Sequence, residues 1–165
     1  MSGVLVDTHI ALWALGDPAR LTDTERALLV DPSVDRRLSP MSIWEAAIKR
    51  EAGRLRAPRN LTAVLAAEFR MLQITASLLE AAAELPRHHA DPFDRVLIAH
   101  ALDEHLSVLT RNPAFAPYGV RIAACATAKP SIRLRGSPVT ASAAAQPIRV
   151  ASAQHDATTD QSSRM

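Results

Sequence analysis

Apolar positions along residues 3–124 follow two alternating patterns. Short apolar runs bounded by polar residues predict buried strands at residues 3–7, 36–40, 71–75, 106–110 and 118–122. Between these runs, apolar residues recur every three or four positions, which predicts helices at residues 8–16, 22–30, 41–53, 60–70, 77–85 and 92–101. Strands that alternate with helices are typical of an α/β domain with a parallel sheet.

Polar residues mark where several of these helices begin. Thr22, with Glu25 three positions later, is typical of a capping box, and Asn60 is expected to cap the helix that follows it. The helix at residues 41–53 has two alternative starts, because Ser39-Pro40 and Ser42 are both suitable caps.

The stretch ADPFDRVLIAHA, residues 90–101, places two carboxylates at the start of a helix. Pro92 lacks an N–H and suits the first helical position, with Asp91 as the N-cap before it. Asp94 then lies at the third position, near free backbone N–H groups and the positive end of the helix dipole. Capping alone explains this segment, so a catalytic role requires carboxylates from elsewhere in the chain.

Composition indicates one globular domain followed by a tail. The chain has 165 residues, 48% of them hydrophobic, but the periodic pattern ends near residue 124. We therefore expect a domain at residues 1–124 and a low-complexity, disordered tail at residues 125–165. Residues 1–124 hold 14 Lys/Arg and 15 Asp/Glu, whereas the tail holds 5 and 2. The basic character thus owes much to the tail and says little about nucleic-acid binding by the domain.

Cysteine content and hydropathy exclude several classes of protein. The single cysteine, Cys125, cannot form an internal disulfide framework or a cysteine-based zinc cluster. No apolar run approaches the roughly 18 residues of a membrane span, and no secretory signal opens the chain. We expect a soluble, cytoplasmic protein.

Three acidic residues lie where a parallel sheet would bring them to one edge. Asp7 directly follows the first strand, while Glu45 and Asp94 lie near helix starts. Asp7 could equally cap the next helix, and Glu45 could bond back to Ser42 as part of a capping box. If the carboxylates do converge, they need a cation, and oxygen ligands suit Mg²⁺ or Mn²⁺ rather than zinc.

Other polar residues lie beside these acids. Asn112 stands at another strand end, although Asn-Pro is also a turn signal. Thr8 and Ser42 could orient metal ligands or a bound water, and Arg95 and Arg111 could contact phosphates. His88 and His89 predict a solvated loop, with His89 a lesser candidate for phosphate contact.

The segments VLVDTHIALWAL, SIWEAAIK, DPFDRVLIAHA and VLTRNPAFAPYGV, in this order, resemble the PIN-domain ribonucleases, and most closely the VapC-type toxins of type II toxin–antitoxin pairs. The resemblance covers residues 3–122. It implies a three-layer α/β/α sandwich with a central parallel sheet, and Mg²⁺-dependent endonucleolytic cleavage of RNA in which a carboxylate-bound metal activates water.

Carried over residue by residue, the resemblance assigns catalytic positions to Asp7, Glu45, Asp94 and Asn112. It implies metal ligation by Asp7, Glu45 and Asp94, with Asp91 matching the additional Asp of the DPFDR form. The position of Asn112 usually holds a fourth acid, so this chain departs from the family there. The long tail is a second departure.

The resemblance also implies a cognate antitoxin that blocks the acidic site, and a homodimer. Ile10, Leu12, Trp13 and Trp44 are apolar candidates for such contacts, with core packing as the alternative. Two further functions stay open. One is an inactive PIN domain that binds RNA or protein. The other is a phosphatase with Asp7 as nucleophile, which His9 disfavours because that chemistry wants a second aspartate two residues on.

Overall fold

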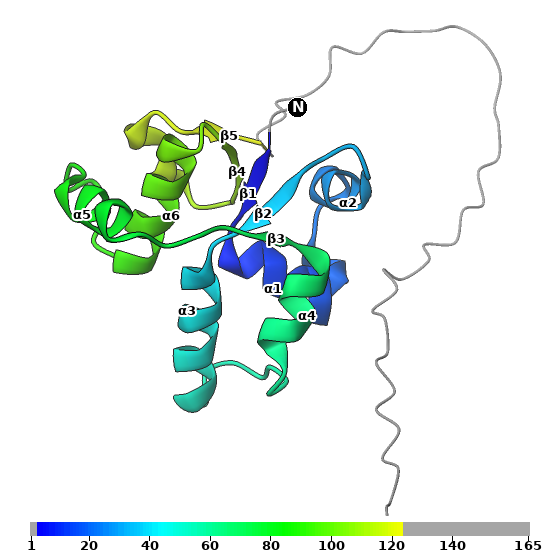
Figure 1. The fold of residues 1–165 in the computed structure, drawn as a ribbon. Helices are drawn as coiled ribbons and strands as arrows, with labels where there is room; N and C mark the ends of the chain where they lie inside the picture. Colours follow the sequence, from blue (N-terminus) through cyan, green and yellow to red (C-terminus); the bar gives the residue numbers. More distant parts are fainter. Residues whose placement is uncertain (1–2, 124–165) are drawn as a thin grey trace, which may run out of the picture.

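The computed structural model describes residues 3–123, and Figure 1 shows their arrangement. The tail expected from residue 125 lies outside this range. Of the helices within residues 3–123, none is long and apolar enough to cross a bilayer.

Within the described residues, the strands form one five-stranded sheet in which every neighbouring pair is parallel. The strands are β1 (Val4–Val6), β2 (Arg36–Leu38), β3 (Arg70–Met71), β4 (Ser107–Leu109) and β5 (Arg121–Ile122), in the order β3-β2-β1-β4-β5. The connecting helices are α1 (Thr8–Gly16), α2 (Asp23–Val30), α3 (Pro40–Glu51), α4 (Leu61–Glu68), α5 (Ala76–Glu84) and α6 (Pro92–Asp103). The predicted parallel α/β architecture is confirmed.

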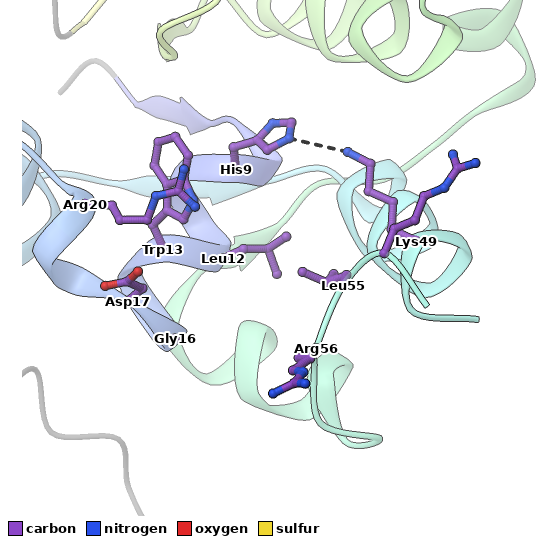
Figure 2. Close-up of a pocket in the computed structure, with 10 residues that line it drawn as sticks. His9, Leu12, Trp13, Gly16, Asp17, Arg20, Lys49, Leu55 and Arg56 are labelled. Atoms are coloured by element: carbon purple, nitrogen blue, oxygen red, sulfur yellow. Dashed lines mark hydrogen bonds between the residues drawn. The ribbon is translucent and has the colours of Figure 1, made fainter. Parts of the chain in front are cut away.

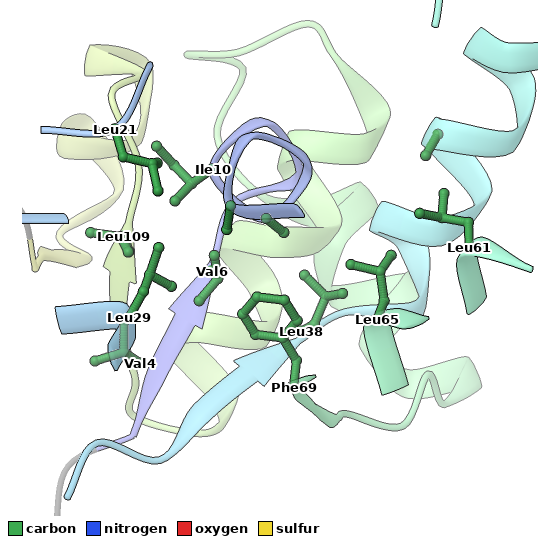
Figure 3. Close-up of a cluster of buried hydrophobic side chains, with 13 residues drawn as sticks. Val4, Val6, Ile10, Leu21, Leu29, Leu38, Leu61, Leu65, Phe69 and Leu109 are labelled. Carbon is green, nitrogen blue, oxygen red and sulfur yellow. The ribbon is translucent and has the colours of Figure 1, made fainter. Parts of the chain in front are cut away.

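Helices cover both faces of the sheet, which gives the expected three layers (Figure 1). Val4 and Val6 of β1 point into one apolar cluster with residues of α1, α2 and α4 (Figure 3). Leu5, between them, points to the opposite face and packs in a second cluster with Leu97 and Ile98 of α6. This alternation follows from the pleat of a strand, and it explains why the apolar run of β1 is continuous.

The helix starts agree with most of the predicted caps. Thr22 and Glu25 form the expected capping box, in which each side chain accepts a hydrogen bond from the other residue's backbone N–H. Helix α3 begins at Pro40 with Ser39 as its cap, so the alternative start at Ser42 is wrong. Asn60 occupies the predicted N-cap position of α4, but its side chain makes no capping hydrogen bond.

All five strands are shorter than the predicted runs, and β3 and β5 are shortened most, to two residues each. The third strand is limited to Arg70–Met71, because Thr75 accepts a hydrogen bond from Leu78 N and caps α5. The last strand is limited to Arg121–Ile122, because a 3₁₀ helix, η2 (Pro113–Tyr118), precedes it and ends at Gly119 with a φ of 76°. A second 3₁₀ helix, η1 (Pro18–Arg20), follows α1. Such local hydrogen bonds compete with the sheet and are not visible in hydropathy.

The choice of Ser39 over Ser42 as the cap of α3 gives a matched pair of variants. Ser39 Oγ accepts from Met41 N at 3.1 Å, whereas Ser42 Oγ is buried and has no hydrogen-bond partner within residues 3–123. Ser39→Ala is expected to lower the free energy of unfolding by about 1 kcal/mol, the usual cost of losing a cap. Ser42→Ala is expected to leave it unchanged or raise it slightly, because no hydrogen bond to another described residue is lost. Urea unfolding of both variants measures the difference, and equal losses would contradict this assignment.

Candidate functional site

The order of the strands creates a crevice at the carboxyl ends of β1 and β4. From β1 the chain proceeds to β2 and β3 on one side, and it later fills β4 and β5 on the other side. The connections that follow β1 and β4 therefore run in opposite directions across the sheet. Open α/β sheets usually bind ligands at the carboxyl ends of two strands related in this way. Asp7 directly follows β1, and Thr110, Arg111 and Asn112 directly follow β4.

Asp7 is buried and held on both of its oxygens. Its Oδ1 accepts from His9 N at 2.9 Å, which caps α1, and its Oδ2 accepts from Thr110 Oγ1 at 2.5 Å. Burial raises the pKa of Asp7, but the hydrogen bonds from His9 and Thr110 outweigh it, so the pKa lies below its ordinary value. Capping and presentation to the crevice are therefore compatible roles, and Asp7 is ionised at neutral pH.

Asp94 faces the same crevice from α6. Its Oδ2 lies 2.9 Å from His89 Nε2 and accepts from Asn112 Nδ2 at 2.9 Å. Burial, followed by the negative charges of Asp7 and Asp91, raises the pKa of Asp94 from 3.8 to about 6. Asp7, Asp94 and Asn112 line one cavity of about 250 Å³. The structure thus brings together three of the predicted catalytic residues.

Asp91 and Glu45 lie near this cavity but are turned towards protein partners. Asp91 is exposed and caps α6, because its Oδ1 accepts from Phe93 N at 2.9 Å. Glu45 is buried on α3, and its Oε1 accepts from Lys49 Nζ at 2.5 Å. Both carboxylates are close enough for their charges to raise the pKa of Asp94.

No group of three or more acidic, histidine or cysteine side chains in residues 3–123 is close enough to enclose a metal ion as the side chains stand. Each carboxylate has a protein partner instead: Thr110 for Asp7, Asn112 for Asp94 and Lys49 for Glu45. A cation at this place therefore requires side-chain rotation, particularly at Glu45.

Two hydroxyl groups beside the acids are unpaired. Thr8 Oγ1 and Ser42 Oγ are buried and have no hydrogen-bond partner within the part of the chain described here. Thr8 directly follows Asp7, and Ser42 lies one turn before Glu45 on α3. Because buried polar groups are normally satisfied, unpaired hydroxyls indicate a missing partner such as water or a ligand.

Both candidate phosphate-binding arginines have protein partners. The Arg95 guanidinium donates to the carbonyl oxygens of Ala83, Leu85, Pro86 and His89 at 2.7–3.4 Å, and so holds the loop that precedes α6. Arg111 donates to Glu25 and to the carbonyl of Arg20. Arg111 still lines the cavity, so its contact with a phosphate stays a prediction, as does that of Arg95.

His89 is less solvated than the sequence predicts. Its side chain lies in a loop but is only 16% exposed, and it contacts both Asp94 and Asn112. Tyr118 Oη fixes this loop by accepting from His89 N at 2.8 Å. The adjacency of His89 to Asp91 was visible in the sequence, but the contact with Tyr118, 29 residues away, was not.

Comparisons with known proteins agree with this fold. The family model described as "PIN domain" matches residues 4–120. No curated protein matches the sequence.

Two solved structures share the fold at low sequence identity. VapBC2 from Rickettsia felis, bound to a DNA fragment from its promoter, has a TM-score of 0.55 and 14% identity, and the match covers 72% of this chain and 95% of that one. A toxin–antitoxin complex from Klebsiella pneumoniae has a TM-score of 0.50 and 20% identity, over 69% and 91% of the two chains. Because the family model spans most of the described residues, this chain belongs to the PIN-domain family.

Proposed function

We propose that this protein is a Mg²⁺-dependent endoribonuclease, the toxin of a toxin–antitoxin pair. PIN domains are generally nucleases and typically use divalent metal ions. The similar structures from Rickettsia felis and Klebsiella pneumoniae are toxin–antitoxin complexes, which supports an antitoxin partner. The observation that carries the proposal is the pairing of Asp7 and Asp94 in one cavity, where burial and neighbouring charges raise the pKa of Asp94 to about 6.

The residues present fit a hard divalent cation. The available donors are carboxylate, amide and hydroxyl oxygens, which suit Mg²⁺ or Mn²⁺. A cation would offset the burial and the repulsion that raise the pKa of Asp94. Thr8 and Ser42 offer buried hydroxyls that have no partner among the described residues. Asp7 and Asp94 would hold the ion, with Glu45 and Asp91 as further ligands.

The bound cation would supply charge that stabilises phosphate oxygens and lowers the pKa of water. The chain's own residues set up the site for this chemistry. Thr110 and His9 keep Asp7 ionised and oriented, and Asn112 orients Asp94. Thr8 and Ser42 would orient a water molecule through their free hydroxyl groups.

A non-cleaving PIN domain that binds RNA or a partner protein is the second candidate. Asn112 favours it, because this side chain supplies an oxygen but no charge, and its amide now donates to Asp94. The expected homodimer and cytoplasmic location also stay predictions. Of the apolar residues considered for contacts, Ile10 is buried in the core, whereas Trp44 is 55% exposed beside Phe93.

Mapping of new 5′ ends in total cellular RNA tests the proposed function. Purified, antitoxin-free protein with Mg²⁺ is expected to produce discrete cuts that disappear with chelator and in Asp94→Asn. Asp103→Asn is the matched control, because it removes an exposed carboxylate from the other end of the same helix and is expected to cut normally. An absence of cuts from folded protein, with Mn²⁺ also tried, would favour the non-cleaving binding module.

The burial of Asp94, together with repulsion from nearby carboxylates, predicts an unusual effect of Asp94→Asn on stability in metal-free protein. The unfolded chain ionises Asp94 near 3.8, but the folded protein does so only near 6, so ionisation destabilises the fold increasingly as the pH rises from 4 to 6. Asp94→Asn is therefore expected to raise the free energy of unfolding by about 1–2 kcal/mol at pH 8, with a smaller gain towards pH 4. Thermal unfolding across this pH range measures the difference.

Asn112→Asp serves as the opposite change in the same measurement. It adds a carboxylate beside Asp94 and is expected to destabilise the metal-free protein at pH 8 while increasing the stabilisation by Mg²⁺. Equal stability of all three proteins at pH 8 would show that these carboxylates do not repel one another.

A further inference from the structure

A basic groove lies next to the carboxylates, on the side of α1, η1 and the segment that follows α3 (Figure 2). Its volume is about 560 Å³. Leu12, Trp13 and Leu55 supply its apolar surface, and Leu12 and Leu55 point towards each other in Figure 2. We call it the α1–α3 groove. A concave site of this volume with apolar walls is typical of small-molecule-sized ligands rather than of a nucleic-acid duplex.

The α1–α3 groove adjoins the carboxylate cavity. His9 and Trp13 line both spaces, so the two residues form a boundary that the groove shares with the cavity of Asp7 and Asp94. A chain molecule bound in the groove would therefore pass directly by the proposed site of cleavage.

Positive charge dominates the rim of the groove. The groove is lined by four cationic side chains and by one carboxylate, that of Asp17. The cations are Arg20, Lys49, Arg54 and Arg56. Lys49 is already paired with Glu45, but no ion pair within residues 3–123 engages Arg54 or Arg56, and both side chains are exposed. Exposed guanidinium groups along an apolar groove are suited to bind phosphates.

Trp13 lies where the groove meets the cavity. The guanidinium carbons of Arg20 and Arg111 lie 4.4 Å and 4.8 Å from its ring centroid. Arg20 is exposed, so a nucleobase could stack on its guanidinium plane. If the Arg20 side chain moves aside, the base could stack on the Trp13 ring instead. Aromatic and guanidinium planes both stack with unpaired bases and are tolerant of sequence.

We propose that the α1–α3 groove binds a single-stranded RNA segment beside the phosphate that is cut, with phosphates on Arg54 and Arg56 and a base on the Trp13–Arg20 surface. The inference rests on the proposed function, because the position of this basic groove beside the acidic cavity is what favours RNA over an acidic protein segment. A duplex would leave the stacking surface unused, since its bases are already paired.

Tryptophan fluorescence tests the stacking contact without cleavage. The chain has two tryptophans, so Trp44→Phe leaves Trp13 as the sole reporter. In the presence of chelator, a short oligouridylate is expected to quench Trp13, whereas an abasic oligomer with the same number of phosphates leaves it unquenched. Equal quenching by both oligomers would overturn the stacking contact. An acidic peptide that binds as tightly and quenches as strongly would assign the groove to a protein partner instead.

Anisotropy of the same labelled RNA tests the groove as a whole. Trp13→Leu is expected to weaken binding about tenfold, the usual effect of losing one stacked base. Arg54→Ala with Arg56→Ala is expected to weaken it and to reduce the slope of log affinity against log salt by about 1.4. Arg70→Ala with Arg121→Ala is the matched control, because it removes the same charge from exposed edge-strand positions outside the groove.

The outcomes separate the groove from the nuclease. If the groove variants bind as the control does while wild-type protein cuts RNA, the groove assignment is wrong and the nuclease stands. If the groove variants lose binding but wild-type protein never cuts, the groove stands and the proposed function fails. Arg54 and Arg56 are exposed, so their variants remain informative even if Trp13→Leu does not fold. Undetectable binding of RNA by the wild-type protein would overturn the groove assignment.

Discussion

The burial of Asp94 beside the charged Asp7 is the constraint on which the rest of the site depends. Parallel pairing of β1 with β4 fixes the place where Asp7 and Asn112 leave the sheet, and α6 adds Asp94 to the same cavity. Partial burial disfavours the ionised form of Asp94, the negative charge of Asp7 adds to this effect, and the pKa of Asp94 rises to about 6 as a result. A fold that keeps two acids in this arrangement is less stable than it could be, as is common at functional sites.

Several hydrogen-bonding partners hold these acids in place. Thr110 and the His9 backbone bind Asp7, while His89 and Asn112 bind Asp94. The charge of His89 lowers the pKa of Asp94, but burial and the charges of Asp7 and Asp91 outweigh it. The cationic side chains nearby, such as Lys49 and Arg111, are paired with Glu45 and Glu25 instead. The carboxylates are thus held in fixed positions while the pKa of Asp94 stays raised. A bound divalent cation would favour the ionised form of Asp94.

The sequence was sufficient to predict the parts of the fold that depend on local pattern. The alternating apolar runs predicted the succession of strands and helices along the chain. The Asp91-Pro92 start of α6 was also predicted correctly, because the conformation that proline imposes is local. The contacts of His89 and Arg111 could not be predicted, because they join residues far apart in the chain. The same holds for the α1–α3 groove, whose walls come from separate elements and whose shape depends on packing.

Carbon-detected NMR of the aspartate side chains tests most directly whether the pKa of Asp94 is raised and whether a bound cation lowers it. Asp94 is assigned by comparison with Asp94→Asn, and its carboxyl is titrated in metal-free protein and again with saturating Mg²⁺. We expect a midpoint near 6 without metal, in line with the raised pKa, and a large downward shift when Mg²⁺ is added. A midpoint close to the ordinary 3.8 that does not respond to Mg²⁺ would contradict both the repulsion and the metal site.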